Sequence, residues 1–128
     1  DIKLNITPYH PIIGFNSNST WNFPINMNQP KIIDCEEIYT FIINNRQSVL
    51  VEDFIFATFG HNLKEDIIYH KYLGSEKVID DLKNIIGYDK GNIILTKDMF
   101  KRNINGDINF IGTHFKLNFI NNLYYANL

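Results

Sequence analysis

Two prolines near the start of the chain bracket a tyrosine and a histidine, and this short block limits how the first residues can fold. Pro8 and Pro11 fix their own φ angles and donate no backbone hydrogen bond, so residues 6–11 cannot run through the centre of a sheet. The alternating apolar residues before the block predict a half-buried strand that enters a rigid turn. Thr7 and His10 share this turn, which places a hydroxyl beside a group that transfers protons near neutral pH.

The pair of Thr7 and His10 has a structural explanation as well as a catalytic one. A turn threonine commonly hydrogen-bonds to its own backbone, and the histidine beside it can lie on the surface. In a catalytic site the hydroxyl would donate a hydrogen bond and the imidazole would give or take a proton, as activation of a peptide bond requires. The motifs farther along the chain help to decide between the structural and the catalytic explanation.

The composition fits one domain with a hydrophobic core. The chain has 128 residues, 45% of them hydrophobic, with ten Phe and seven Tyr. Its net charge is -2, and the nearby Lys97, Lys101 and Arg102 fit a solvated helix face, so we expect no nucleic-acid partner. No stretch approaches the roughly 20 apolar residues that span a bilayer. We therefore expect a soluble, intracellular chain without a membrane partner.

Periodicity predicts a mainly β fold with one added amphipathic helix. The apolar residues between Ser75 and Ile86 recur at helical spacing, Ser75 can cap the first turn, and Gly87 supplies a left-handed stop. The pattern also predicts a short helix at 97–102. Strands are predicted at 2–6, 37–43, 48–51, 54–59, 66–73, 92–95 and 108–120, with a hairpin turn at Asn44 and Asn45.

Six blocks of the sequence occur in an order that resembles the closing half of the Hint fold, which inteins and hedgehog autoprocessing domains share. They read ITPYHP, WNFP, CEEIYTF, ATFGHN, HKYLGSEKVIDDL and GYDKG, at residues 6–11, 21–24, 35–41, 57–62, 70–82 and 87–91. The sequence is most similar to the Vint branch of this superfamily, over roughly residues 2–95. The resemblance implies a Hint-type β fold, and the predicted helix fits the Vint branch.

The resemblance also implies autoprocessing chemistry. In Hint domains a Cys or Ser side chain attacks the carbonyl of the peptide bond just before it, so the amide nitrogen needs a proton and the oxyanion needs hydrogen bonds. By position, His10 would protonate this nitrogen, and Thr7 would hold the carbonyl or the imidazole. His61 would assist resolution of the intermediate, and Asn62 falls where inteins place the asparagine that cyclises.

The sequence departs from the family pattern in two ways, and both limit the activity that the resemblance implies. The family's initiating Cys or Ser lies upstream of the Thr-x-x-His block, and the sequence given starts at Asp1. We therefore expect residues 1–128 to form a single Hint/Vint-like domain that lacks the nucleophile segment. The partner we expect is this upstream segment of the same precursor, on the same chain or a separate one. Asn62 precedes Leu63 rather than Cys, Ser or Thr, which favours N-terminal self-cleavage over splicing.

Other reactive side chains have structural interpretations that we prefer. Cys35, the lone cysteine, excludes an internal disulfide; as a thiolate it could attack a carbonyl, but it resembles the family's structural cysteine. His70 matches a Vint histidine and is either close to the site or a turn-stabilising residue, and His114 lies outside the matched blocks. His61, His70 and Asp66 lack a recognisable metal-ligand spacing. We expect no metal and no cofactor.

The leading hypothesis is single-turnover, autocatalytic peptide cleavage, active when the upstream segment is supplied. One alternative is the C-terminal fragment of a split intein-like protein that splices in trans. Another is a degenerate Hint fold that serves as a protein-binding module. The leading hypothesis expects the rings of His10 and His61 to converge on a shared pocket that can hold an amide group.

Overall fold

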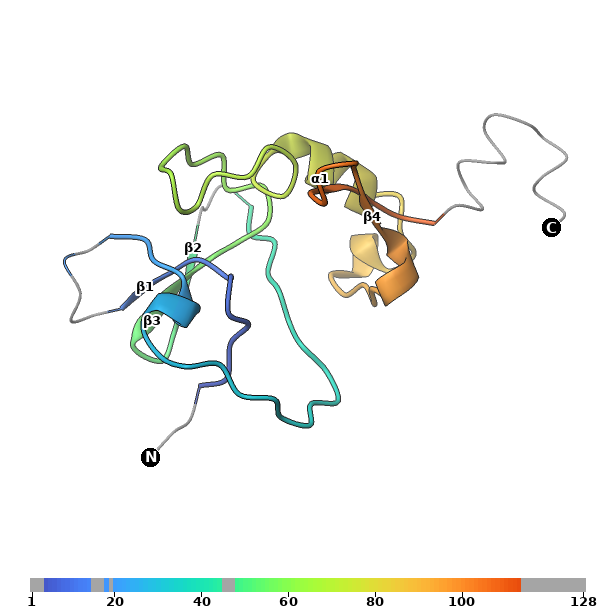
Figure 1. The fold of residues 1–128 in the computed structure, drawn as a ribbon. Helices are drawn as coiled ribbons and strands as arrows, with labels where there is room; N and C mark the ends of the chain where they lie inside the picture. Colours follow the sequence, from blue (N-terminus) through green and yellow to red (C-terminus); the bar gives the residue numbers. More distant parts are fainter. Residues whose placement is uncertain (1–3, 15–17, 19, 45–47, 114–128) are drawn as a thin grey trace, which may run out of the picture.

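The computed structural model describes residues 4–14, 18, 20–44 and 48–113. Over these residues the chain forms two small antiparallel sheets, one short α-helix and several 3-10 turns, joined by long loops. In Figure 1 the three-stranded sheet lies on one side, and the helix and the two-stranded sheet lie together on the other. The mostly loop and β character agrees in part with the predicted mainly β fold.

The three-stranded sheet is built around a hairpin. β2 (Ser48–Val51) and β3 (Phe54–Ala57) are joined by a two-residue turn, in which Glu52 adopts a left-handed backbone with φ 53°. β1 (Ile12–Gly14) pairs with the other edge of β3, which gives the order β1-β3-β2. Ile12 lies opposite Phe56, and both are buried, whereas Leu50 is 59% exposed. One face of this sheet therefore packs inward, as strand alternation requires.

The helix α1 (Glu76–Leu82) forms where the sequence predicts it but ends earlier. Ser75 caps its first turn by accepting a hydrogen bond from the backbone N–H of Lys77, and Val78 and Leu82 are fully buried. Beyond Leu82 the chain goes through successive turns rather than another helical turn. The Asn84 side chain donates to the Asp80 carbonyl, which satisfies one of the open carbonyls at the helix end.

The main core lies between α1 and the second sheet, which consists of β4 (Phe100–Arg102) and β5 (Ile108–Ile111). The buried side chains of this core are Tyr72, Val78, Leu82, Met99 and Ile111. The Tyr72 hydroxyl donates to Asp81 on α1 at 2.6 Å and accepts from the Ile111 backbone N–H at 2.7 Å. This one side chain therefore ties the helix to β5. Two 3-10 turns, Tyr88–Lys90 and Lys97–Met99, complete this half.

Several predicted elements are corrected by the structure. The residues at 37–43, 66–73 and 92–95 form loops and turns instead of strands, and 97–102 splits into a 3-10 turn followed by β4. The described part of 2–6 is not a strand, and β1 begins after Pro11 instead. β-branched and aromatic residues favour a strand only where a partner strand is present. Asn45, 1–3 and 114–120 lie outside the described residues.

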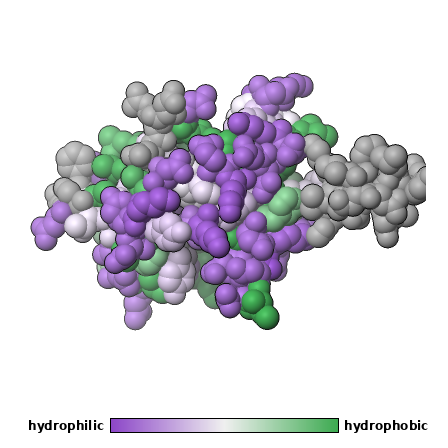
Figure 2. Space-filling view, turned by 90° about the horizontal axis from the view of Figure 1, so that it is seen from above, coloured by the Kyte–Doolittle hydropathy of each residue, from purple (hydrophilic) through white to green (hydrophobic). Residues whose placement is uncertain are grey.

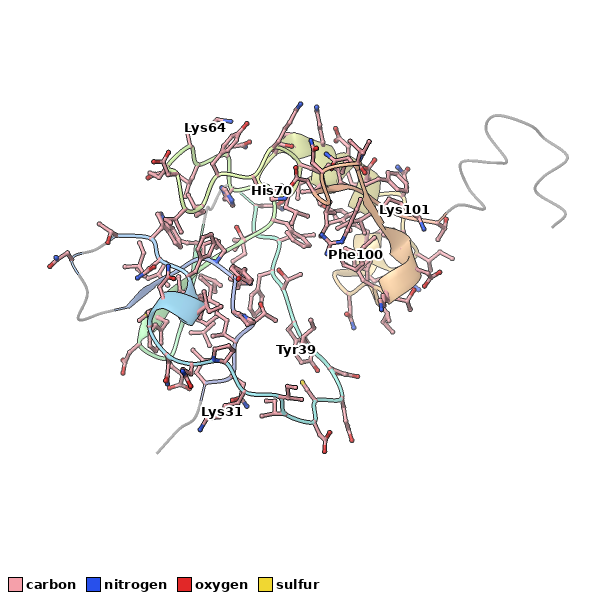
Figure 3. The ribbon with its side chains drawn as sticks, viewed as in Figure 1. Lys31, Tyr39, Lys64, His70, Phe100 and Lys101 are labelled. Atoms are coloured by element: carbon pink, nitrogen blue, oxygen red, sulfur yellow. The ribbon has the colours of Figure 1, made fainter. Side chains whose placement is uncertain are left out.

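A long loop, residues 31–41, carries exposed apolar side chains. Those with the greatest exposure are Ile32, Ile33, Ile38 and Tyr39. Figure 3 labels Tyr39 on this loop, and in Figure 2 the visible face is mostly polar with small, separate apolar areas. At its end, the Phe41 carbonyl accepts a hydrogen bond from the Phe59 backbone N–H. No helix among the described residues is both long and apolar enough to cross a membrane.

Candidate active site at the end of β3

The turn that holds Thr7 and His10 is fixed at both of its sides. The backbone N–H of His10 donates to the Thr7 carbonyl at 3.2 Å, which closes the turn. The Pro8 carbonyl accepts from the Ile25 backbone N–H at 3.1 Å, and the Tyr9 ring meets Phe23 edge-on. The segment around residues 22–26 thus supports the turn from outside, while the Thr7 side chain remains exposed.

His10 is anchored to the last residue of β3 because Pro11 leaves a hydrogen-bond acceptor free. The Ala57 backbone N–H donates to the Pro11 carbonyl, so the β1–β3 ladder continues by one pair. In a complete ladder residue 11 would donate back to the Ala57 carbonyl, but proline has no N–H. The His10 Nε2 takes this place, 2.9 Å from the Ala57 oxygen, and the ring also meets Phe56 edge-on.

This anchor determines which nitrogen of His10 is available for chemistry. Because a carbonyl oxygen only accepts, Nε2 carries the hydrogen, and Nδ1 bears the lone pair of the neutral ring. Nδ1 has no hydrogen-bond partner among the described residues. Burial lowers the pKa of His10, and the hydrogen bond to Ala57 offsets this in part. The ring is therefore neutral at pH 7 and can accept a proton at Nδ1.

Thr58, the residue after β3, carries a buried hydroxyl without a partner. Its side chain is 3% exposed, and Oγ1 forms no hydrogen bond within the described part of the chain. Thr58 directly follows Ala57, whose carbonyl oxygen accepts from Nε2 of His10. The pairing with the β1 side ends here, because the next backbone N–H, that of Phe59, donates to the Phe41 carbonyl.

His61 is buried in a different set of contacts. It is 5% exposed, and its Nδ1 accepts a hydrogen bond from the Leu63 backbone N–H at 2.9 Å. Burial lowers the pKa of His61, while a backbone hydrogen bond with Ile68 raises it in part. A Cβ at Gly74 would lie 2.8 Å from Cε1 of the ring, so the ring occupies the space that this glycine leaves. The ring is held by the loop that leads into α1.

Asn62 stands at a turn where its residue type has a backbone explanation. Its φ is 60°, in the left-handed region that asparagine tolerates better than most residues. Its backbone N–H donates to the Gly74 carbonyl at 2.8 Å, and its side chain is exposed.

The structure brings Thr7 and His10 together and joins their turn to Ala57, but it gives His10 and His61 no common contact. Among the described residues the His10 ring meets Ala57 and Phe56, whereas the His61 ring meets Leu63, Ile68 and Gly74. The catalytic roles predicted for these residues stay predictions. A pocket shared by the two rings is likewise still a prediction.

A family model with the description Vint: Hint-domain matches residues 1–109 of the chain. The chain belongs to the Vint family of Hint domains. No curated protein matches the sequence. The family is associated with autoprocessing, and the matched residues include the turn, all three strands of the first sheet, and α1.

The other candidate side chains of this Vint domain have separate positions. The Nδ1 atom of His70 accepts from the backbone N–H groups of Tyr72 and Leu73, so this ring stabilises the turn before α1 (Figure 3). Burial lowers the pKa of His70. Cys35 is exposed and donates to the Glu37 carbonyl. His114 lies outside the described residues, within which no three His, Cys, Asp or Glu side chains are arranged to hold a metal ion.

Sequence reasoning did not single out Thr58 or the relation between Pro11 and Ala57. A signal for Thr58 was present, because positions 54, 56 and 58 share one face of a strand. Its closeness in the chain to the residue that anchors His10 depends on a contact between His10 and Ala57, 47 residues apart, which periodicity alone does not give.

Proposed function

We propose that this Vint domain cleaves a peptide bond of its own precursor through an acyl shift to a Cys or Ser side chain upstream of Thr7. The observation that carries the proposal is the state of His10. Its ring is anchored through Nε2 to Ala57, it is neutral near pH 7, and its Nδ1 has no partner among the described residues. A fixed imidazole with one free nitrogen suits proton transfer to a peptide nitrogen.

The reaction has three steps, which are attack on the carbonyl, cleavage of the C–N bond and hydrolysis of the intermediate. The thiol or hydroxyl attacks the carbonyl carbon and forms a C–S or C–O bond, while its proton passes to Nδ1 of neutral His10. The C–N bond then breaks, its electron pair stays on nitrogen, and His10 returns the proton there. Water hydrolyses the resulting thioester or ester, which releases a carboxylic acid and restores the thiol or hydroxyl. In this proposal the exposed Thr7 hydroxyl would hold the carbonyl or the imidazole.

Within the same proposal, His61 and Asn62 belong to the steps after the acyl shift. His61, which directly precedes Asn62 in the chain, would assist hydrolysis of the intermediate. Asn62 would stabilise the turn rather than cyclise. Its left-handed backbone supports that role, since the conformation alone accounts for an asparagine at this position. We therefore favour cleavage over splicing, including splicing in trans.

The exposed loop at residues 31–41 supports a second candidate function, a Hint fold that binds another protein. Ile32 and Ile38 are largely exposed, and exposed apolar side chains in one segment are typical of interaction sites. A binding module would retain its partner without any change in chain length. Cleavage of the precursor therefore separates the two functions.

The experiment is to express the precursor that contains this domain and to follow its chain length by mass spectrometry. In a His10→Gln variant the amide can still donate to the Ala57 carbonyl but cannot carry a proton, so cleavage should fall by at least about 10²-fold. His70→Gln is the matched control, because His70 only stabilises a turn, and its precursor should still cleave. Unchanged processing of the His10→Gln precursor would overturn the proposal.

A further inference from the structure

One face of the β1–β3 pair includes His10, and Thr58 follows at the end of β3. Gly14 lies against the Phe54 ring, since a Cβ on this glycine would be 3.3 Å from the ring, and His10 meets the Phe56 ring. These contacts show that residues 10, 12 and 14 share a face with 54 and 56. Thr58 directly follows β3, where strand alternation would continue the face of Phe54 and Phe56, and it is next in the chain to Ala57, to whose carbonyl His10 donates.

The polar side-chain atoms on this face are Nδ1 of His10 and Oγ1 of Thr58, and neither has a partner among the described residues. The Ala57 carbonyl, one residue before Thr58 in the chain, already accepts from Nε2 of His10. The other side chains of the face, Ile12, Phe54 and Phe56, are apolar. The buried hydroxyl therefore belongs to the residue that follows Ala57, to which the proton acceptor His10 is anchored.

We propose that the Thr58 hydroxyl donates a hydrogen bond to the carbonyl oxygen of the scissile peptide while His10 acts on the nitrogen of the same peptide group. This inference rests on the proposed autocleavage. The ligand is a backbone peptide group, which offers an acceptor oxygen and a nitrogen that leaves. Thr58 then touches the reacting group and is a catalytic residue beside His10.

The burial of Thr58 fits this task. Negative charge develops on the carbonyl oxygen when the nucleophile attacks, and a donor away from water stabilises that charge more than an exposed one does. Thr58 is far more buried than Thr7, whose side chain is exposed. The scissile peptide belongs to the same precursor, so it is laid against this face as the chain folds and needs no open channel. The step adds no new proton transfer, because the hydroxyl keeps its hydrogen.

The experiment compares three variants of the precursor. Thr58→Val keeps the shape but removes the hydroxyl, and we expect cleavage to slow on the order of 10²-fold. Its thermal midpoint should not fall, because the change removes a buried polar atom that has no partner. Thr58→Ser restores a hydroxyl and should cleave within a few-fold of the parent. Thr40→Val, at an exposed threonine, is the control and should match the parent.

Each other outcome overturns the inference in a distinct way. If the Thr58→Val precursor cleaves within about twofold of the parent, or slows only as its thermal midpoint falls, the role of Thr58 is structural. If the serine variant is as slow as the valine variant, the hydroxyl is not responsible. A shifted pH profile in Thr58→Val would mean that Thr58 acts through His10 and not on the peptide. A parent precursor that does not cleave refutes the proposed function itself, and the role of Thr58 with it.

Discussion

Replacing Gly74 by alanine tests how tightly the fold holds His61. The new Cβ would lie 2.8 Å from Cε1 and 3.0 Å from Nε2 of the His61 ring, and 2.9 Å from the His70 carbonyl oxygen. These separations are shorter than van der Waals contact, so the His61 ring, the His70 carbonyl or the backbone at position 74 must move. The His61 ring cannot move freely, because it is buried and its Nδ1 accepts from the Leu63 N–H. Overpacking of this kind costs about 1–3 kcal/mol, and we expect about 2 kcal/mol here.

A double-mutant cycle with His61→Ala isolates the part of this cost that belongs to the ring. His61→Ala removes two of the three close contacts and leaves only the one with the His70 carbonyl. Gly74→Ala should then cost less in that background, with a coupling energy of about 1 kcal/mol. Gly91→Ala is the control: its Cβ meets nothing, and its φ of +81° carries a backbone cost of about 1–2 kcal/mol that is independent of His61.

The assay is urea unfolding of the four proteins of the cycle, with the free energy of unfolding obtained from the midpoint and slope. If Gly74→Ala costs less than about 0.5 kcal/mol, the fold does not hold the His61 ring tightly against this glycine. If the cost is the same with and without the His61 ring, the contact is not between these two residues.

Three further predictions concern stability and exposure. Tyr72→Phe leaves the buried Ile111 N–H without its acceptor and should lower the free energy of unfolding in urea by about 1–3 kcal/mol. Tyr69→Phe, at a half-exposed ring, is the control and should lower it by less than about 0.5 kcal/mol. Burial lowers the pKa of three histidines, so the unfolded chain binds more protons below pH 6.5. The free energy of unfolding should be fully retained above that pH and should fall as pH decreases through the folded-state pKa values. The fall is up to about 1.4 kcal/mol per pH unit for each histidine. A free energy of unfolding that does not change with pH would contradict this expectation. Trypsin should cut after Lys31, in the exposed loop, before it cuts after Lys77 in α1; equal rates would show that the loop is protected.

The sequence predicted those elements whose signals are local. Ser75 as a cap and the spacing of Val78 and Leu82 were enough to place α1. β2 and β3 were found as short apolar runs, although the prediction for β3 ran on to residue 59. The end of the helix was not predicted, because Ile85 and Ile86 continue the helical spacing although Ile86 is 96% exposed. A periodic pattern shows which residues could share a face but not whether a neighbour covers that face.

The predicted strand at 37–43 was wrong for a related reason. Its β-branched and aromatic residues fit a strand, but the hairpin in the structure is formed by β2 and β3 around Glu52. Ile38 and Tyr39 are instead exposed on the long loop. Strand formation depends on a partner, and the choice of partner is a property of the whole fold. The turn with Thr7 and His10 was found because its prolines act locally.

The buried polar atoms of this Vint domain fall into two groups, and the division separates structural side chains from the candidate site. Nδ1 of His61 and of His70 accept backbone N–H groups, and the Tyr72 hydroxyl both donates and accepts. In contrast, the buried Oγ1 of Thr58 has no partner among the described residues, and Thr58 directly follows Ala57, whose carbonyl oxygen accepts from Nε2 of His10. An unpaired buried hydroxyl costs about 1–3 kcal/mol, and natural folds tolerate such costs mainly where a site needs the group. A valine at position 58 would remove that cost, which is why a threonine there is better explained by a peptide group that it binds than by the packing of the sheet.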